Sequence, residues 1–337
     1  MVADFSGGHL SSDGGVLLLR QIDHGLGVTR ALAACFGDSR DARFVEHSVA
    51  ELLAQRVHGL ALGYEDLNDH AELRRDPLLA VAAGKLDPLG AARRDPADRG
   101  QALAAAPTLH RLELGNCRDS RYHKIAHDPA AIEATLLAMG VRALPRETTE
   151  VVLDFDASDD PLHGRQEGRF FHGDYGPYGY LPLFCFAGEV ILWAQLRPSD
   201  IDASEGTVEA LEKIVAALRR RFPQVRIIVR GDSGFCREAI MAWCEAQAEV
   251  SYCLGLAKNA RLTGRLAPAL ERARAKQILC GGASVREFAE LTYPKFGNRN
   301  HGLRGLRGFS GTCTQHVRHP WSDLVFVLPA AQLPPSA

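Results

Sequence analysis

The fold is decided by the stretch VVLDFD, residues 151–156, in which an apolar, β-rich run ends in two acids. Valine and phenylalanine favour strands. Asp154 and Asp156 are two residues apart, so they share one face of an extended strand. A second apolar stretch, VRIIVR at 225–230, is typical of a buried strand and is soon followed by Asp232. The two stretches predict strands of an α/β sheet that each end at a carboxylate.

The segments around these strands extend the prediction to a whole sheet. Periodicity and turn signals predict strands over 180–186 and 190–196, a helix over 204–221, a helix over 238–249 and a strand over 250–256. Ser204 is the expected cap of the first helix, and Pro223 stops it. The order predicts an α/β fold with a mixed sheet flanked by helices, in which an antiparallel meander precedes the crossovers.

Residues 1–147 predict a mostly helical N-terminal region. Ser48 precedes apolar residues at spacings of three and four, and Glu51 follows three residues after it, which is the pattern of a capping box. Residues 84–106 are rich in Gly, Pro, Arg, Asp and Ala and predict a loop or linker.

Composition sets the broad class of protein. The chain has 337 residues, of which 46% are hydrophobic and 24% charged, enough for one large or two modest domains. No apolar run approaches the roughly 20 residues of a membrane span, and no secretory signal is visible, so we expect no membrane partner and a cytoplasmic protein. Eight scattered cysteines lack zinc spacing and are expected to be reduced. The net charge of −2 counts mildly against DNA binding, although local patches set the field at a groove.

The acids at the strand ends suggest a metal site. Ligand sites in open α/β sheets lie just beyond the carboxyl ends of strands, where Asp232 is expected opposite Asp154 or Asp156. Carboxylate oxygens suit a hard cation such as Mg²⁺, and two such ions can clamp a phosphodiester without any protein nucleophile. The alternative is structural: Asp232 caps a turn, and the other two acids are solvated.

Several blocks resemble one group of bacterial DDE transposases, the insertion-sequence thirteen-eighty group. The resemblance runs in order from about residue 5 to about residue 291. Its blocks are LSSDGG at 10–15, QR at 55–56, GYEDLND at 63–69, PTL at 107–109 with RLE at 111–113, LDFDASDDPLHGRQEG at 153–168, LRPS at 196–199 and RGDSGF at 230–235.

The resemblance implies a fold, a reaction and site residues. It implies an RNase H-like catalytic core, Mg²⁺ as cofactor with Mn²⁺ as the alternative, and double-stranded DNA as partner, both as inverted-repeat transposon ends and as target. A homo-oligomer is a further partner that it allows. Asp156 matches the first catalytic aspartate and Asp232 the second. Asp154 competes with Asp156, because both lie on one face and the motif alone does not separate them.

The sequence departs from this group after residue 291. The group's third catalytic acid is a Glu on a later helix, but residues 292–337 contain one acid, Asp323, and show no hydrophobic periodicity. Glu287 and Glu290 are the nearest acids, and they lie in a block that precedes the catalytic Glu in the group. We hypothesise that a frameshift or truncation replaced the natural C-terminus. Shifting the reading frame near codon 292 should then reveal the missing Glu.

These observations predict three regions and leave alternatives for the function. The regions are an N-terminal helical region at 1–147 for DNA-end binding and subunit contacts, an incomplete RNase H-like core at 148–291 and an aberrant tail at 292–337. The predicted function is metal-dependent cleavage at inverted repeats followed by strand transfer in DNA transposition. The alternatives are a catalytically dead DNA-binding remnant and a different metal-dependent phosphoryl hydrolase.

Overall fold

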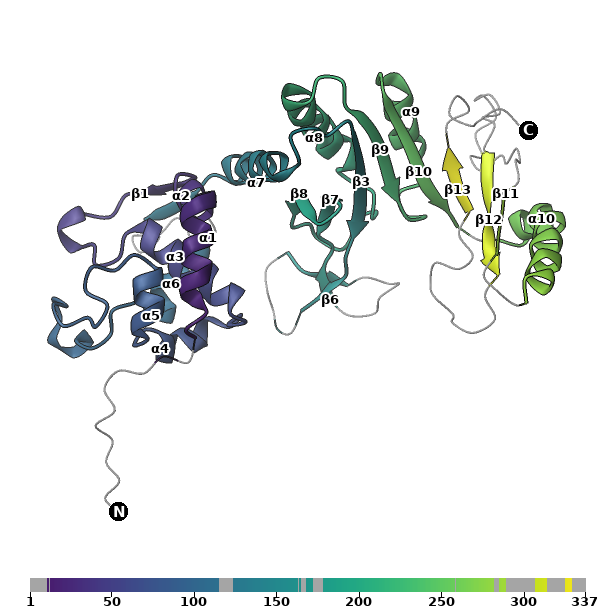
Figure 1. Cartoon of the computed structure of the whole chain (residues 1–337). Helices are drawn as coiled ribbons and strands as arrows, with labels where there is room; N and C mark the ends of the chain where they lie inside the picture. The colour runs from purple at the N-terminus through teal and green to yellow at the C-terminus, as the bar shows by residue number, and fades with distance from the viewer. Residues whose placement is uncertain are drawn as a thin grey trace, which may run out of the picture. The chain divides into compact units, whose positions relative to one another are not determined.

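The computed structural model describes residues 11, 13–114, 124–162, 164, 168–171, 178–257 and 259–281, and the backbone of three later strands at 285–288, 307–313 and 325–328. The chain forms two compact units, 1–135 and 136–337, which are described separately (Figure 1). Their boundary lies 12 residues before the one expected from the sequence, inside helix α7 (Pro129–Ala143).

The N-terminal unit is mostly helical, as predicted. Its elements are α1 (Val16–Leu26), α2 (Val28–Ala33), α3 (Val49–Ala61), α4 (His70–Leu73), α5 (Pro77–Ala82) and α6 (Ala106–Glu113), the 3₁₀ turns η1 (Ala42–Phe44), η2 (Leu67–Asp69) and η3 (Pro96–Asp98), and the antiparallel pair β1 (Phe36–Asp38) and β2 (Ile125–His127). Residues 84–106, expected as a loop, contain the 3₁₀ turn η3, and α6 begins at their last residue, Ala106.

Helix α3 begins with the predicted capping box. The Ser48 hydroxyl accepts a hydrogen bond from the Glu51 amide at 3.2 Å, and the Glu51 carboxylate accepts one from the Ser48 amide at 2.7 Å. Both bonds satisfy amide groups that the first helical turn leaves unpaired. Leu52 and Leu53, on the buried face of this helix, pack with α6 and Ile125 into one of two small cores of this unit.

The second unit is built on a mixed sheet. Strand β3 (Glu150–Ala157) pairs in parallel with β9 (Arg226–Gly231), and β9 pairs in parallel with β10 (Val250–Leu256). On its other side β3 pairs antiparallel with β7 (Leu183–Ala187), which forms a hairpin with β8 (Val190–Gln195). Numbered along the chain, these five strands lie in the order 3-2-1-4-5. Together with its helices, this arrangement is the RNase H-like fold that the resemblance implies.

Three predicted boundaries in this unit are wrong. The helix expected over 238–249 ends three residues early, at Ala246. The strand expected over 180–186 is interrupted at Pro182, which has no amide hydrogen to donate to a ladder. Residues 178–180 instead form β6, in a small sheet with β4 (Asp160–Pro161) and β5 (Phe170–Phe171). Helix α8 (Thr207–Arg221) begins after Gly206 rather than at Ser204, because the Ser204 hydroxyl bonds to Asp202 within a turn.

The sheet continues toward the C-terminus beyond β10. Helices α9 (Glu238–Ala246) and α10 (Ala260–Leu279) are followed by β11 (Val285–Phe288), β12 (Arg307–Cys313) and β13 (Val325–Leu328). Strand β13 pairs antiparallel with β10, and the sheet order continues through β12 to β11. The region expected as an aberrant tail therefore contributes two strands, β12 and β13, to the sheet.

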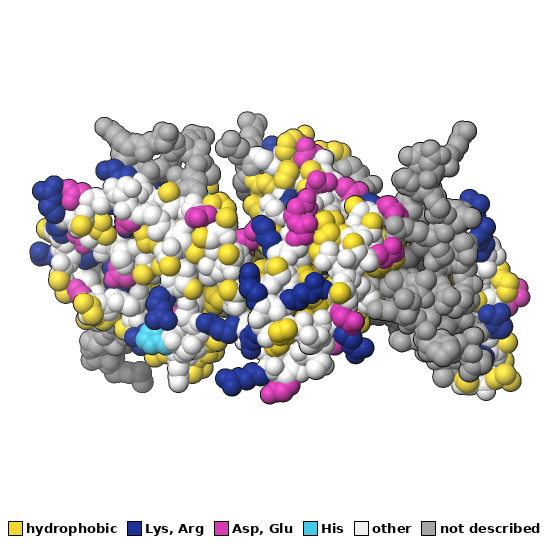
Figure 2. Space-filling view, turned by 90° about the horizontal axis from the view of Figure 1, so that it is seen from above, with side chains coloured by type: hydrophobic (Ala, Val, Ile, Leu, Met, Phe, Trp, Pro, Cys, Tyr) yellow, Lys and Arg dark blue, Asp and Glu magenta, His cyan; other side chains and the backbone are white. Residues whose placement is uncertain are grey.

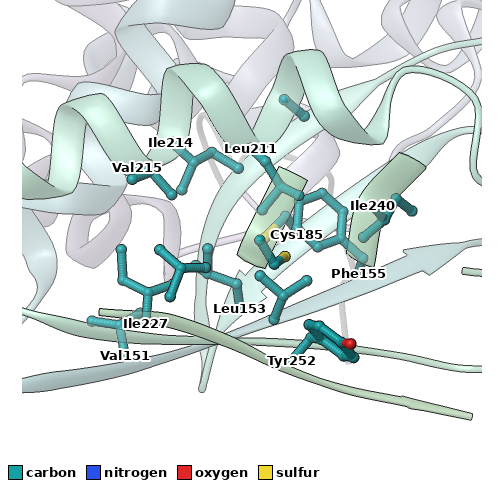
Figure 3. Packing of buried hydrophobic residues seen from close by; sticks show 14 of the residues in the cluster. Val151, Leu153, Phe155, Cys185, Leu211, Ile214, Val215, Ile227, Ile240 and Tyr252 are labelled. Carbon is teal, nitrogen blue, oxygen red and sulfur yellow. The ribbon is translucent and has the colours of Figure 1, made fainter. Parts of the chain in front are cut away.

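Alternation along β3 separates a core face from an exposed face. Val151, Leu153 and Phe155 are at most 4% exposed, and they face the buried side chains of α8 (Figure 3). Leu211 and Ile214 of α8 are fully buried in the same cluster. Each such side chain contributes about 1.5–3 kcal/mol by leaving water. Because side chains alternate along a strand, this packing leaves Asp154 and Asp156 on the opposite face of β3, away from α8.

Two further expectations concern cysteines and membranes. Each cysteine that the structure describes is a free thiol, and four of them are buried. In the described part of the chain, no helix combines the length and the apolar character needed to span a bilayer.

Candidate active site

The register of β3 and β9 brings the two main candidate acids to neighbouring strand ends. Phe155 pairs with Gly231 in the parallel ladder, and Asp156 and Asp232 are the next residue on each strand. Neighbouring strands lie about 4.8 Å apart, so the backbones that carry these acids are adjacent. Both aspartates are exposed. The structure thus places the backbones of Asp156 and Asp232 next to each other at the carboxyl end of this parallel pair.

Asp154 has a different environment, although it is on the same face of β3 as Asp156. It pairs with Arg230 across the ladder, and both carboxylate oxygens accept hydrogen bonds from that guanidinium. The hydrogen bonds that Arg230 donates to Asp154 raise the pKa of this arginine. A bidentate pair of this kind occupies the carboxylate with a fixed cation. Asp154 is therefore less open to an added metal ion than Asp156.

The turn that carries Asp232 depends on two glycines that allow close approach. A Cβ on Gly255 of β10 would lie 2.8 Å from the Ser233 nitrogen and 2.9 Å from the Asp232 carbonyl carbon. A Cβ on Gly231 would lie 2.9 Å from the Cβ of Phe235, a buried side chain. Since such contacts are shorter than real Cβ atoms show, these positions accept only hydrogen without movement. They place the Asp232 turn tightly against β10.

A local hydrogen bond orients the Asp232 side chain within this turn. Its Oδ1 accepts a hydrogen bond from the Gly234 amide at 2.8 Å. This is the arrangement of an Asx turn, in which an aspartate bonds to the backbone two residues later. It leaves Oδ2, and the second lone pair of Oδ1, available to a ligand.

The buried Arg197 holds the segment that follows β8. It is 5% exposed, and its guanidinium donates to the carbonyls of Leu181 at 2.8 Å and Ala203 at 3.2 Å, and to that of Glu205. Burial lowers the pKa of Arg197. In the sequence, this residue is notable only as part of the LRPS block at 196–199. Its structural role could have been suspected from an arginine placed directly after an apolar strand.

An ion pair connects this segment to the Asp232 turn. Arg237 donates to Asp202 at 2.7 Å. Burial by itself would raise the pKa of Asp202, but hydrogen bonds from Arg237 and Ser204 lower it to about 2. Asp202 is therefore ionised throughout the physiological range, and the pair ties the segment after β8 to the chain that follows Asp232.

The donor set fits a hard divalent ion but supplies few ligands. Two exposed carboxylates on adjacent strands offer the oxygen atoms that such ions prefer. Among the residues that the structure describes, no group of three His, Cys, Asp or Glu side chains could together hold a metal. Of the two acids considered for the third position, Glu287 lies in β11, where only the backbone is described, and Glu290 lies outside the described residues.

Charge is unevenly distributed over the surface despite the small net charge. On the face shown in Figure 2, acidic side chains gather in one area of the second unit, and Lys and Arg side chains gather in another. The net charge of −2 therefore does not describe the field that a nucleic acid would meet locally.

Comparison with known proteins identifies the family. Residues 1–295 match the transposase DDE domain, group 1. The chain therefore belongs to this family of DDE transposases, whose domains generally use divalent metal ions. The match ends four residues beyond the end of the resemblance found in the sequence. No curated protein matches the chain.

Two solved structures show weak similarity. One is a piggyBac transposase synaptic complex with hairpin DNA, 12% identical over 96% of this chain and 62% of that one, with a TM-score of 0.38. The other is a Drosophila P element transposase strand transfer complex, 15% identical over 53% of this chain and 36% of that one, with a TM-score of 0.22. The chain thus spans less than two thirds of the length of either.

Proposed function

We propose that this chain cuts DNA at the inverted-repeat ends of a mobile element and joins those ends to target DNA, with Mg²⁺ as cofactor and Mn²⁺ as the alternative. The observation that supports the proposal is the parallel register of β3 and β9, in which Phe155 pairs with Gly231, the residues that directly precede Asp156 and Asp232. Membership of the DDE transposase family supports the reaction class.

Asp156 and Asp232 would hold the divalent ion in this site. A bound ion of this kind activates a water or a 3′-hydroxyl for attack and stabilises the leaving oxygen of the phosphodiester. The Asx turn keeps the Asp232 carboxylate in one orientation, so less ordering is needed when a ligand binds. Asp154 supports the site indirectly, because its pair with Arg230 holds β3 and β9 together beside the metal ligands.

We assign residues 1–147 to DNA-end binding and subunit contacts. We infer that a homo-oligomer of this chain joins the two transposon ends. The catalytic centre lies within residues 148–291. We propose that a frameshift or truncation replaced the natural C-terminus at residues 292–337. Sequencing of the locus tests this, because shifting the reading frame near codon 292 should reveal the missing Glu.

A DNA-binding remnant without catalysis is the second candidate function. The observation that favours it is the lack of a three-ligand cluster among the described residues. Two carboxylates hold an ion loosely, and a site that is poorly preorganised loses much of its electrostatic contribution to the rate. In that case the chain binds transposon ends and cuts them slowly or not at all.

The experiment combines a gel shift with a nicking assay on inverted-repeat DNA, in Mg²⁺ and in Mn²⁺. We expect Asp156→Asn and Asp232→Asn to bind DNA like the wild type and to lose about 100-fold or more of the cleavage rate. The matched control is Glu189→Gln, which changes an exposed acid in the turn between β7 and β8, at the opposite end of β7 from the part that pairs with Asp156.

The outcomes separate the candidates. Wild-type cleavage by Asp156→Asn contradicts the metal-site assignment. Tight binding without nicking by the wild type, in both metals, supports the remnant. Hydrolysis of small phosphate esters without any preference for DNA supports a different phosphoryl hydrolase.

A further inference from the structure

The N-terminal unit contains a basic cavity that the catalytic site does not use. It has a volume of about 330 Å³ and is formed by segments from five separate parts of residues 40–125. Among the residues that the structure describes, five cationic side chains and two carboxylates, Glu46 and Asp98, line it. The cations are Arg40, Arg74, Arg93, Arg111 and Lys124. Asp38, which is not among the lining residues, pairs with Arg40, so the cations are in excess by two and the cavity is attractive to an anion.

The two carboxylates are already engaged. Asp98 accepts hydrogen bonds from Arg74 at 2.7 Å and from Arg93 at 3.3 Å, and Glu46 lies 3.7 Å from Arg93. Arg40 is in turn paired with Asp38 at 2.7 Å. These pairs hold the walls of the cavity and leave two of its described cations, Arg111 and Lys124, without a carboxylate partner among the described residues.

The positive charges of Arg111 and Lys124 are available to an anionic ligand. Arg111 donates to the carbonyl of Pro107 in its own helix at 3.0 Å. Within the described part of the chain, no carboxylate forms an ion pair with either residue. Lys124 is exposed and Arg111 is half-buried, so both can reach a ligand without first breaking an ion pair.

A buried histidine reports the positive field at the cavity wall. His47 is 6% exposed, and its Nε2 lies 2.7 Å from an Arg93 nitrogen. Burial, followed by the charges of Lys85, Arg93, Arg40 and Arg74, lowers the pKa of His47 to about 3. Its Nδ1 is buried without a hydrogen-bond partner in the described structure. The neutral imidazole therefore lies beside four cations, each of which is also paired with a carboxylate.

An exposed aromatic ring lies at the same cavity. Phe44 lines it and is 69% exposed. The guanidinium groups of Arg43 and Arg94 lie over this ring, 5.7 Å and 5.4 Å from its centre. An exposed aromatic ring next to a basic pocket offers a nucleotide both a stacking surface and a phosphate site.

We propose that this cavity binds one phosphate of DNA, contacted by Lys124 and Arg111, while Phe44 packs against the adjoining sugar or base. The inference rests on the proposed function in taking DNA as the ligand. It adds a specific docking point in the N-terminal unit, remote in sequence from the acids of the sheet.

The test measures how the affinity of the full chain for labelled inverted-repeat duplex depends on salt, by fluorescence anisotropy. We expect the double variant Lys124→Gln/Arg111→Gln to bind more weakly and to lower the slope of log K against log salt by about 0.9, the value for one phosphate. Phe44→Ala should weaken binding about tenfold and leave the slope unchanged. The matched control, Arg75→Gln, removes an exposed cation that does not line the cavity and should change neither quantity.

The inference is overturned if the double variant has the affinity and slope of Arg75→Gln while its circular dichroism and melting temperature match the wild type. It is also overturned if inorganic phosphate raises the melting temperature of the wild type and not that of the double variant, while the two proteins bind DNA with equal affinity. Cleavage reads out the proposed function separately. A chain that binds DNA through this cavity without cutting it supports the inference and contradicts catalysis, whereas a wild type that binds no DNA contradicts both.

Discussion

Gly255→Ala tests whether β10 positions the Asp232 turn. The added methyl group would lie 2.8 Å from the Ser233 nitrogen, 2.9 Å from the Asp232 carbonyl carbon and 3.3 Å from the Asp232 Cα. Each of these is a backbone atom, so no side chain can rotate away. Ordinary van der Waals contacts begin at 3.4 Å, so the turn must move by roughly 0.6 Å to relieve the 2.8 Å contact with the Ser233 nitrogen. Packed interiors leave little room that could take up the methyl group without this movement.

This displacement sets the expected magnitudes. Overpacking of this kind costs about 1–3 kcal/mol of unfolding free energy. Catalytic groups tolerate errors of about 0.5 Å, and a 1 Å displacement can cost about 100-fold in rate. We therefore expect Gly255→Ala to reduce the cleavage rate by about tenfold or more, measured by nicking at saturating metal, with urea denaturation alongside.

Gly264→Ala is the control in the same unit. Gly264 lies within α10, and a Cβ there would meet nothing within 4 Å. Alanine should raise the unfolding free energy by about 0.5–1 kcal/mol, because glycine is unfavourable inside a helix, and should leave cleavage unchanged. Wild-type stability and cleavage in Gly255→Ala would refute the close approach. A loss of stability with unchanged cleavage would refute its role in positioning Asp232.

Three further predictions concern ion pairing, a buried amide and pH. Asp154→Asn should lower the unfolding free energy by less than about 1 kcal/mol, because its ion pair is partly exposed, and cleavage should fall far less than in Asp156→Asn; equal losses would make Asp154 the ligand. Gln55→Ala should lower the unfolding free energy, measured by urea denaturation, by about 3 kcal/mol or more. Gln55 is 1% exposed, and its side-chain amide bonds to both the backbone amide and the carbonyl of Ala104. An unchanged denaturation midpoint would contradict this role. Burial lowers the pKa of His47 to about 3 and that of His70 to about 4, from 6.5. Below pH 6.5 the unfolded chain therefore binds more protons than the folded chain. The unfolding free energy should fall between pH 6.5 and pH 4 by up to about 1.4 kcal/mol per pH unit for each histidine. Urea denaturation at several pH values checks this, and a flat profile would contradict it.

Local sequence signals predicted part of the N-terminal unit and missed its interior. The two partners of the capping box, Ser48 and Glu51, are only three positions apart in the chain, so the pattern itself contains both of them. By contrast, Gln55 meets His70 at 3.0 Å and the backbone of Ala104 at 2.9 Å. Those partners lie 15 and 49 residues away, and no periodicity along the chain indicates which distant groups will satisfy a buried amide. The basic cavity was missed for the same reason.

The sequence by itself determined the strands that carry the acids and the positions of Asp156 and Asp232 at their ends, because alternation and apolar runs are properties of neighbouring residues. The tertiary structure decided that Arg230 lies opposite Asp154, because that contact exists only when β9 pairs in parallel with β3 in one particular register. It likewise decided that β10 passes against the Asp232 turn at Gly255. Pairing between strands depends on contacts across many intervening residues, and a single chain pattern does not encode which register packs the core.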